Sequence, residues 1–166
     1  MSAVDEFFDR LDYPMYVVTA VAGRERAGCL VGFASQCSMV PLRLMVWLST
    51  ANRTYRVARS ADVLAVHQLS RAQYELAEHF GGLTGDEVDK FADIAWREGP
   101  AGTVLLDDAP AWLVGQVEGQ VEGGDHVGFL LSPLEASVPR PPSREGELFR
   151  LSDSEGIDAG HPVQDA

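Results

Sequence analysis

Residues 27–41 read AGCLVGFASQCSMVP, and together with residues 49–55, which read STANRTY, they decide the fold. The first segment begins with a strand-like apolar run. Five small or polar residues follow: Ala34, Ser35, Gln36, Cys37 and Ser38. Small side chains leave backbone N–H and C=O groups accessible, and the hydroxyl and amide groups add donors and acceptors, which suits a flat polar heterocycle. The alternative is a plain strand followed by a Ser-rich loop.

Most of the remaining pattern indicates β-strands. β-Branched and aromatic residues cluster in short runs, and turn-forming residues separate these runs, as at 23–28 and 123–126. The continuous apolar run at 44–48 is typical of a strand that is buried on both faces. Strands are expected at 16–21, 29–34, 44–48, 63–69, 103–106, 111–121 and 127–134.

Apolar spacing and capping signals predict four short helices. The first, at 4–11, is amphipathic and is expected to pack across the strands. The second reaches about residue 61 and begins at a cap formed by Thr50 or Asn52. Two more helices, at 74–80 and 88–91, follow capping-box patterns.

Short strands interrupted by helices predict a mainly β fold, a closed Greek-key β-barrel with α-helical insertions. A Rossmann domain is excluded because no G-x-G-x-x-G follows a predicted strand. With 166 residues, 46% of them hydrophobic, the chain has room for one domain with a real core, expected at 1–138. Residues 139–166 are rich in Pro, Gly and acidic residues and predict a partly flexible arm, with a short docking strand at 148–151.

The formal net charge of −12 argues against nucleic acid and against anionic membrane surfaces as partners, since both would be repelled. The same field repels small phosphate-bearing molecules. Any phosphate site must therefore be locally basic.

The cysteines and histidines give no sign of a disulfide or a metal centre. Cys29 and Cys37 would lie roughly 26 Å apart along a straight strand, so they are not expected to pair. No His or Cys residues have the spacing of metal ligands. Without a signal-like start or an apolar run of membrane-spanning length, the sequence predicts a cytoplasmic protein.

Several motifs in order resemble the flavin reductase-like family. They are G-x-x-x-x-x-x-S-x-x-S-x-x-P at 28–41, N-R-T at 52–54, D-K-F at 89–91 and G-D-H at 124–126. The resemblance runs from about residue 13 to about residue 137. It implies a split barrel of the FMN-binding type.

The resemblance also implies which residues hold a flavin. The family pattern has a Thr and a Ser-Ser pair where this chain has Leu30, Gly32 and Phe33, so hydroxyl contacts from these positions cannot be carried over. The implied flavin-binding residues are Ala34, Ser35, Gln36, Cys37, Ser38, Ser49, Asn52, Arg53 and Thr54.

Residues 49–54 are the candidate phosphate site. Hydroxyl groups, an amide and backbone N–H groups converge there with Arg53 at a predicted helix start. A plain helix cap is the alternative. Capping does not explain why Arg56 and Arg59 follow at intervals of three residues in so acidic a chain.

Two further residues are candidates for chemistry or binding. The resemblance implies that His126, in G-D-H, lies near the open flavin face as the catalytic residue; as a residue after a Gly-Gly-Asp turn, it has a structural role as its alternative. Lys90, in D-K-F, would meet either a phosphate or an acidic neighbour at the surface.

The resemblance implies an oxidoreductase that reduces FMN with NAD(P)H, with FAD or riboflavin as alternative flavins. It would act as a homodimer and supply reduced flavin to a partner oxygenase. The competing hypothesis is a flavin- or tetrapyrrole-binding protein without turnover, or a deazaflavin-dependent variant. The missing hydroxyl groups at Leu30, Gly32 and Phe33 favour the competing hypothesis, and Asp125-His126 favours the reductase.

Overall fold

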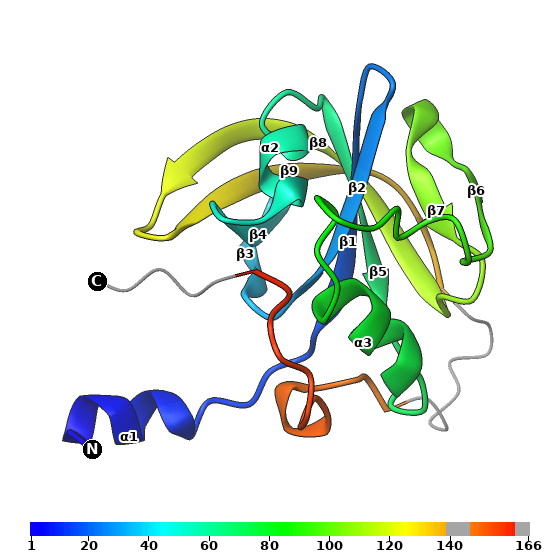
Figure 1. The fold of residues 1–166 in the computed structure, drawn as a ribbon. Helices are drawn as coiled ribbons and strands as arrows, with labels where there is room; N and C mark the ends of the chain where they lie inside the picture. Colours follow the sequence, from blue (N-terminus) through cyan, green and yellow to red (C-terminus); the bar gives the residue numbers. More distant parts are fainter. Residues whose placement is uncertain (139–146, 162–166) are drawn as a thin grey trace.

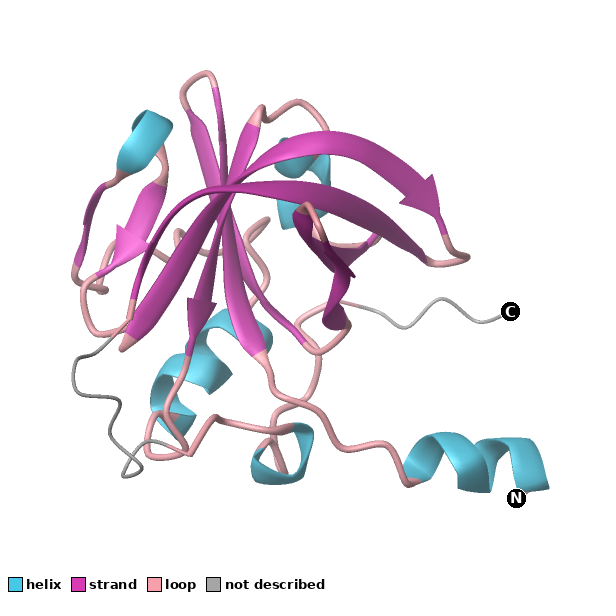
Figure 2. Ribbon diagram, turned by 180° about the vertical axis from the view of Figure 1, so that it is seen from behind, coloured by secondary structure: helices cyan, strands magenta, loops and turns pink. Residues whose placement is uncertain are grey.

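A seven-stranded antiparallel sheet forms the body of the protein, for which the structure, a computed structural model, describes residues 1–138 and 147–161. The strand order is β2-β1-β5-β8-β9-β4-β3. The sheet twists strongly and curls until β2 approaches β4, which closes a split barrel (Figures 1 and 2). Its strands are β1 (Tyr16–Ala22), β2 (Glu25–Val31), β3 (Ala34–Met39), β4 (Leu42–Ser49), β5 (Val63–Gln68), β8 (Ala111–Glu122) and β9 (His126–Ser137).

Smaller elements surround the barrel. A two-stranded sheet pairs β6 (Trp96–Glu98) with β7 (Val104–Leu106). The helices are α1 (Ala3–Asp9), α2 (Arg53–Ala58) and α3 (Tyr74–Gly81), with 3-10 turns η1 (Pro100–Gly102) and η2 (Leu151–Asp153). The predicted class, a mainly β split barrel with helical insertions, is confirmed. Within the described residues, no helix is long and apolar enough to cross a membrane.

Of three buried apolar clusters among the described residues, the two larger ones lie on opposite sides of β1. Val18 belongs to the cluster inside the barrel, which also holds Leu48 and Phe129. Its neighbour Val17 faces the opposite way, into a cluster with Phe80 of α3. Because successive side chains of a strand point to opposite faces, β1 is buried on both.

Three sequence predictions are wrong. Residues 35–38 form no loop but part of the edge strand β3, where small polar side chains fit because most of them are exposed. Strand β4 is not buried on both faces. The helix predicted at 88–91 is a series of turns.

The N-terminal helix α1 also differs from expectation. It does not pack across the strands; it has no buried residue and projects away from the barrel (Figure 1). Its N-terminus is capped as a capping box by Ser2 and Asp5.

The C-terminal segment that the structure describes, 147–161, lies against the barrel. Phe149 is fully buried, its N–H donates to the Leu69 carbonyl at 2.9 Å, and its carbonyl accepts from Met15 N–H at 2.8 Å. The apolar patch at 148–151 thus docks between two chain segments, as isolated bridges of Arg150 and Leu148 also indicate. The rest of the predicted arm, 139–146 and 162–166, lies outside the described residues, and the boundary at 138 stays a prediction.

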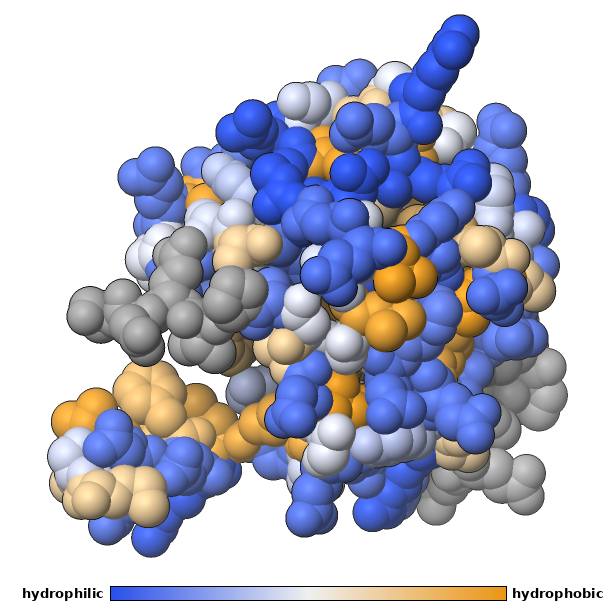
Figure 3. All heavy atoms as spheres, in the orientation of Figure 1, coloured by the Kyte–Doolittle hydropathy of each residue, from blue (hydrophilic) through white to orange (hydrophobic). Residues whose placement is uncertain are grey.

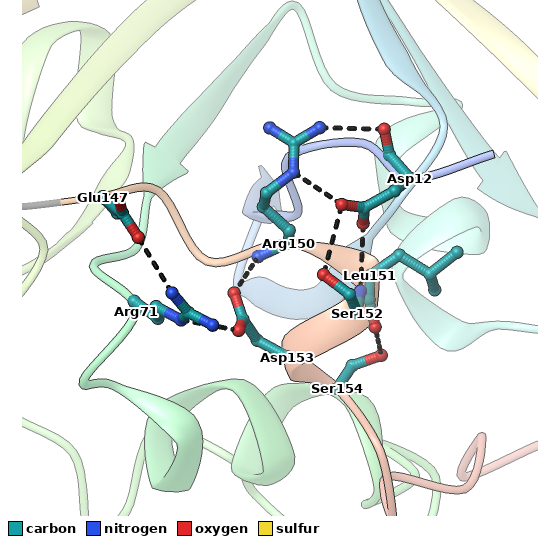
Figure 4. A network of polar contacts seen from close by, with 8 residues as sticks. All are labelled: Asp12, Arg71, Glu147, Arg150, Leu151, Ser152, Asp153 and Ser154. Atoms are coloured by element: carbon teal, nitrogen blue, oxygen red, sulfur yellow. Dashed lines mark hydrogen bonds and ion pairs between the residues drawn. The ribbon is translucent and has the colours of Figure 1, made fainter. Parts of the chain in front are cut away.

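Ion pairs at the surface hold the segment 147–161 against the barrel (Figure 4). Arg150 donates through Nε to Asp12 Oδ2 at 2.9 Å, and the Ser152 N–H donates to Asp12 Oδ1 at 3.0 Å. Arg71 reaches both Asp153 and Glu147. The Arg150 hydrogen bond lowers the pKa of Asp12, so this carboxylate stays ionised. The segment therefore joins the N-terminal stretch to the loop after β5.

Candidate functional site

The junction between β4 and α2 carries the predicted phosphate-binding residues. Ser49 ends β4, and its Oγ accepts from the Ala51 N–H at 3.3 Å. Asn52 is the helix cap, since its side-chain oxygen accepts from the Thr54 N–H at 3.0 Å. Thr50, the other predicted cap, instead donates through its N–H to the Asp125 carbonyl at 2.9 Å.

His126 lies beside this junction. Strand pairing sets it opposite Ser49, and the centroid of its ring lies 5.0 Å from that of Phe33. The Asp125 carboxylate lies 2.7 Å from His126 Nδ1, and this contact lowers the pKa of Asp125. An ionised carboxylate can only accept, so Nδ1 carries the proton and Nε2 is the ring nitrogen left for a ligand. Residues from β4, β9 and the segment before β3 thus meet at one point.

Two glycines near His126 pack closely against aromatic rings, which leave no room for a side chain. A Cβ atom at Gly32 would lie 2.7 Å from the Tyr13 ring, which explains why no serine stands there. A Cβ atom at Gly123 would lie 2.5 Å from the Trp47 ring. The small residue of the Gly-Gly-Asp-His turn therefore makes room for Trp47.

The predicted residues of β3 spread away from His126 along the sheet edge. Ala34 pairs with Val46, but Ser38 pairs with Arg43 at the other end of β4. At about 3.3 Å per residue, Ser38 lies roughly 20 Å from Ser49 along that strand. Ala34 and Ser35 are thus near the junction, and Ser38 is not.

A cavity of about 430 Å³ lies beside the start of α2. Arg53 and Thr54 line it, together with Gly28 and the loop at 85–91. Four cationic and four anionic side chains balance in its lining: Arg24, Arg26, Arg53 and Lys90 against Glu25, Asp86, Glu87 and Asp89. The ion pair between Arg53 and Glu25 is long, at 3.9 Å, and partly exposed, so the guanidinium can exchange partners at little cost.

Charge is unevenly distributed along the chain at this place. From residue 26 to residue 61 there are five arginines and no acidic residue, in a chain with 25 acidic residues. This arginine-only stretch includes β3, β4 and α2. Three of its arginines pair with acidic side chains from outside the stretch: Arg26 with Asp89, Arg53 with Glu25 and Arg56 with Asp86. An anion bound there would therefore replace these partners.

Lys90 is a buried residue that the sequence assigns to the surface. Its Nζ donates to the carbonyl oxygens of Gly28 at 3.0 Å and Phe80 at 2.8 Å. Burial lowers the pKa of Lys90 and raises that of the neighbouring Cys29 thiol, which a hydrogen bond with the Thr54 hydroxyl counteracts. Thr54 is thus turned toward the barrel. The apolar residue Phe91 next to Lys90 is the signal for burial that the sequence offers.

The residues present fit a flavin at the junction. Arg53 suits a phosphate, the edge of β3 offers backbone donors and acceptors, and the Phe33 and His126 rings, tilted by 56° to each other, offer aromatic contacts. Among the described residues, no group of three His, Cys, Asp or Glu side chains could hold a metal ion. Cys29 and Cys37 are free thiols, as predicted.

The split barrel and this junction define a class of protein, and comparison with known proteins gives the family. The family model described as "Flavin reductase like domain" matches residues 8–152, so the chain belongs to that family. A Rhizobium meliloti protein named "Probable flavin reductase" is 32% identical over 114 residues, which are 66% of this chain but 36% of that protein. This chain therefore spans about a third of that relative's length.

Two other proteins are similar over most of their length. The Mycobacterium tuberculosis protein "Flavin-dependent monooxygenase, reductase subunit HsaB" is 28% identical over 137 residues, covering 77% of this chain and 69% of that protein. The structure of the Streptomyces globisporus NADH:FAD oxidoreductase SgcE6 has a TM-score of 0.77 at 24% identity, and the match covers 91% of this chain and 88% of that one. The second similarity establishes the fold.

Proposed function

We propose that the protein is an NAD(P)H-dependent flavin reductase that binds FMN at the junction of β3, β4, α2 and β9. The observation that carries the proposal is that Phe33 and Ser49, both in the arginine-only stretch, meet His126 of β9. The flavin, when bound, supplies the hydride-accepting ring. FAD and riboflavin are the alternative flavins.

The residues of the chain hold and orient the reactants. Arg53 would hold the flavin phosphate, and the backbone of Ala34 and Ser35 would offer hydrogen bonds to the ring. His126 presents Nε2 to the nicotinamide, while the Asp125 carboxylate fixes its tautomer through Nδ1. The histidine positions the donor and transfers no proton.

FMN is expected to bind more tightly than riboflavin by a factor of about 10 to 150, because one charge-assisted phosphate contact contributes about 1.5–3 kcal/mol. Calorimetric titration of both flavins measures this ratio. In Arg53→Gln the FMN affinity should fall toward that of riboflavin, and the riboflavin affinity should not change. Equal affinities in the unsubstituted protein would remove the phosphate site.

His126→Ala is expected to slow flavin reduction by NAD(P)H about tenfold or more while FMN affinity stays within a few-fold, because a positioning contact is lost. Stopped-flow bleaching at saturating FMN separates rate from affinity. Arg53→Gln is the matched control, since it should weaken FMN binding and keep the rate at saturation. An unchanged rate in His126→Ala would leave this histidine a turn residue.

The proposed partners are a second copy of the chain, in an isologous homodimer, and an oxygenase that consumes reduced flavin. The name of the similar M. tuberculosis reductase subunit supports the oxygenase. A flavin-binding protein without turnover is the second candidate, favoured by Leu30, Gly32 and Phe33 in place of hydroxyl residues. A flavin spectrum that neither NADH nor NADPH bleaches would favour that candidate.

A further inference from the structure

The N-terminal helix α1 is well formed but covers nothing. The Asp5 N–H donates to Ser2 Oγ at 3.2 Å, and the Ser2 N–H donates to Asp5 Oδ2 at 2.8 Å. Phe7 and Phe8 are nevertheless 64% and 62% exposed. Figure 3 shows apolar atoms on the surface of this projecting helix. A seven-residue helix is marginal alone in water, and an exposed apolar face favours docking.

The base of α1 is fixed. Asp12 is bound to Arg150 and Ser152, and the centroids of the Tyr13 and Phe33 rings lie 5.8 Å apart. The helix therefore leaves the barrel from an anchored point. Among the described residues of a single copy it packs on no other element, since none of its residues is buried.

The β3–β4 hairpin offers a matching surface. At its tip, Met39 is 78% exposed and Val40 is 94% exposed, and Leu42 beside them is also exposed. Strand β3 pairs only with β4 in the sheet, so the other edge of its backbone has no partner strand among the described residues. An unpaired strand edge and an exposed apolar hairpin tip are both surfaces for association.

Charge is compatible with this contact. The helix carries Asp5, Glu6 and Asp9, and Arg10 follows it. The hairpin lies in the arginine-only stretch, with Arg43 next to Leu42, and carries no acidic residue. An acidic helix therefore meets a cationic side chain and no carboxylate there.

We propose that α1 docks on the β3–β4 hairpin of a second copy of the chain, so that two copies exchange their N-terminal helices. The inference rests on the dimer of the proposed function and assigns it a surface. A two-fold axis makes both contacts at once. The partner's helix then lies at the end of the strand that carries Ser35 and Ser38.

Crosslinking tests the exchange without any flavin. Cys37 is exposed on β3 and Cys29 is buried, so Cys37 is the native thiol within reach. A short bis-maleimide should join Phe8→Cys to Cys37 of the other copy and give a product of twice 18.0 kDa. Mixing the Phe8→Cys/Cys37→Ser protein with the unsubstituted protein should give the same product. Leu83→Cys, a surface thiol on another element, is the control and should not crosslink.

The other possible outcomes would contradict the exchange of helices, and they differ in what they leave standing. An internal crosslink at the mass of one chain would mean that α1 folds onto its own hairpin, and would overturn the exchange. A dimer by light scattering with no crosslink above the Leu83→Cys control would also overturn it, while the proposed dimer and flavin site stand. A monomer that still binds FMN would remove the exchange and the dimer but not the reductase.

Discussion

Phe149→Ala is expected to lower the free energy of unfolding by about 3–5 kcal/mol, the cost of emptying a fully buried phenylalanine site. The ring lies among Val17, Leu69 and Phe80, and the centroid of Tyr74 is 6.4 Å away. These neighbours belong to β1, α3 and the loop after β5, so the cavity cannot close by moving one element. Urea unfolding followed by circular dichroism measures the loss.

Leu134→Ala is the matched control, because Leu134 is 52% exposed and its truncation should change stability by no more than about 0.5 kcal/mol. Phe149→Leu, which keeps most of the volume, should lie between the two. A loss in Phe149→Ala as small as in Leu134→Ala would mean that the segment at 147–161 contributes no core.

Acid is expected to destabilise the protein through His67. This histidine is fully buried, its Nδ1 lies 3.0 Å from the Val17 carbonyl, and its Nε2 accepts from the Leu106 N–H at 3.2 Å. The contact with the Leu106 N–H requires the neutral ring, because a protonated Nε2 cannot accept; the contact with the Val17 carbonyl only requires a proton on Nδ1. Burial lowers the pKa of His67 from 6.5 to about 4.

The sign of the effect follows from proton binding. Between pH 6.5 and about 4 the unfolded chain binds a proton at this position and the folded chain does not, so stability falls as the pH falls. The loss is about 2 kcal/mol at pH 5 and about 3 kcal/mol when complete. The full stability is present when the pH is well above 6.5, where the ring is neutral in both the folded and the unfolded chain.

His67→Gln tests this, because glutamine can still donate and accept but does not titrate in this range. Comparing its urea midpoint with that of the unsubstituted protein at pH 7 and pH 5 cancels the carboxylates common to both. The variant should lose less stability between the two pH values. The same loss in both proteins would assign the acid sensitivity to other groups.

The sequence predicts the strands that follow a simple pattern and not those that depend on distant partners. The strands β1, β5, β8 and β9 are predictable because apolar and β-branched residues fill them. The polar composition of β3 reads as a loop, since only pairing with β4 makes it a strand. The burial of Phe149 depends on contacts with residues far away in the chain, which no local pattern records.

In the candidate site, local sequence signals predict the cap of α2. They do not predict which residues from different strands come together in space. Asn52 is predictable because the capping signal is local. The meeting of His126 with Phe33 depends on the register of β4 against β9, and the inward turn of Lys90 depends on α3. Neither can be read from motif spacing.

The burial of Phe149 in the core also affects how the chain folds while it is being synthesised. A ribosome delivers the chain from its N-terminus, so every strand of the barrel emerges before this residue does. Until then the hollow around Val17 and Phe80 stays open and apolar. The core between β1 and α3 is therefore completed only when Phe149 has been synthesised and packs against Val17 and Phe80.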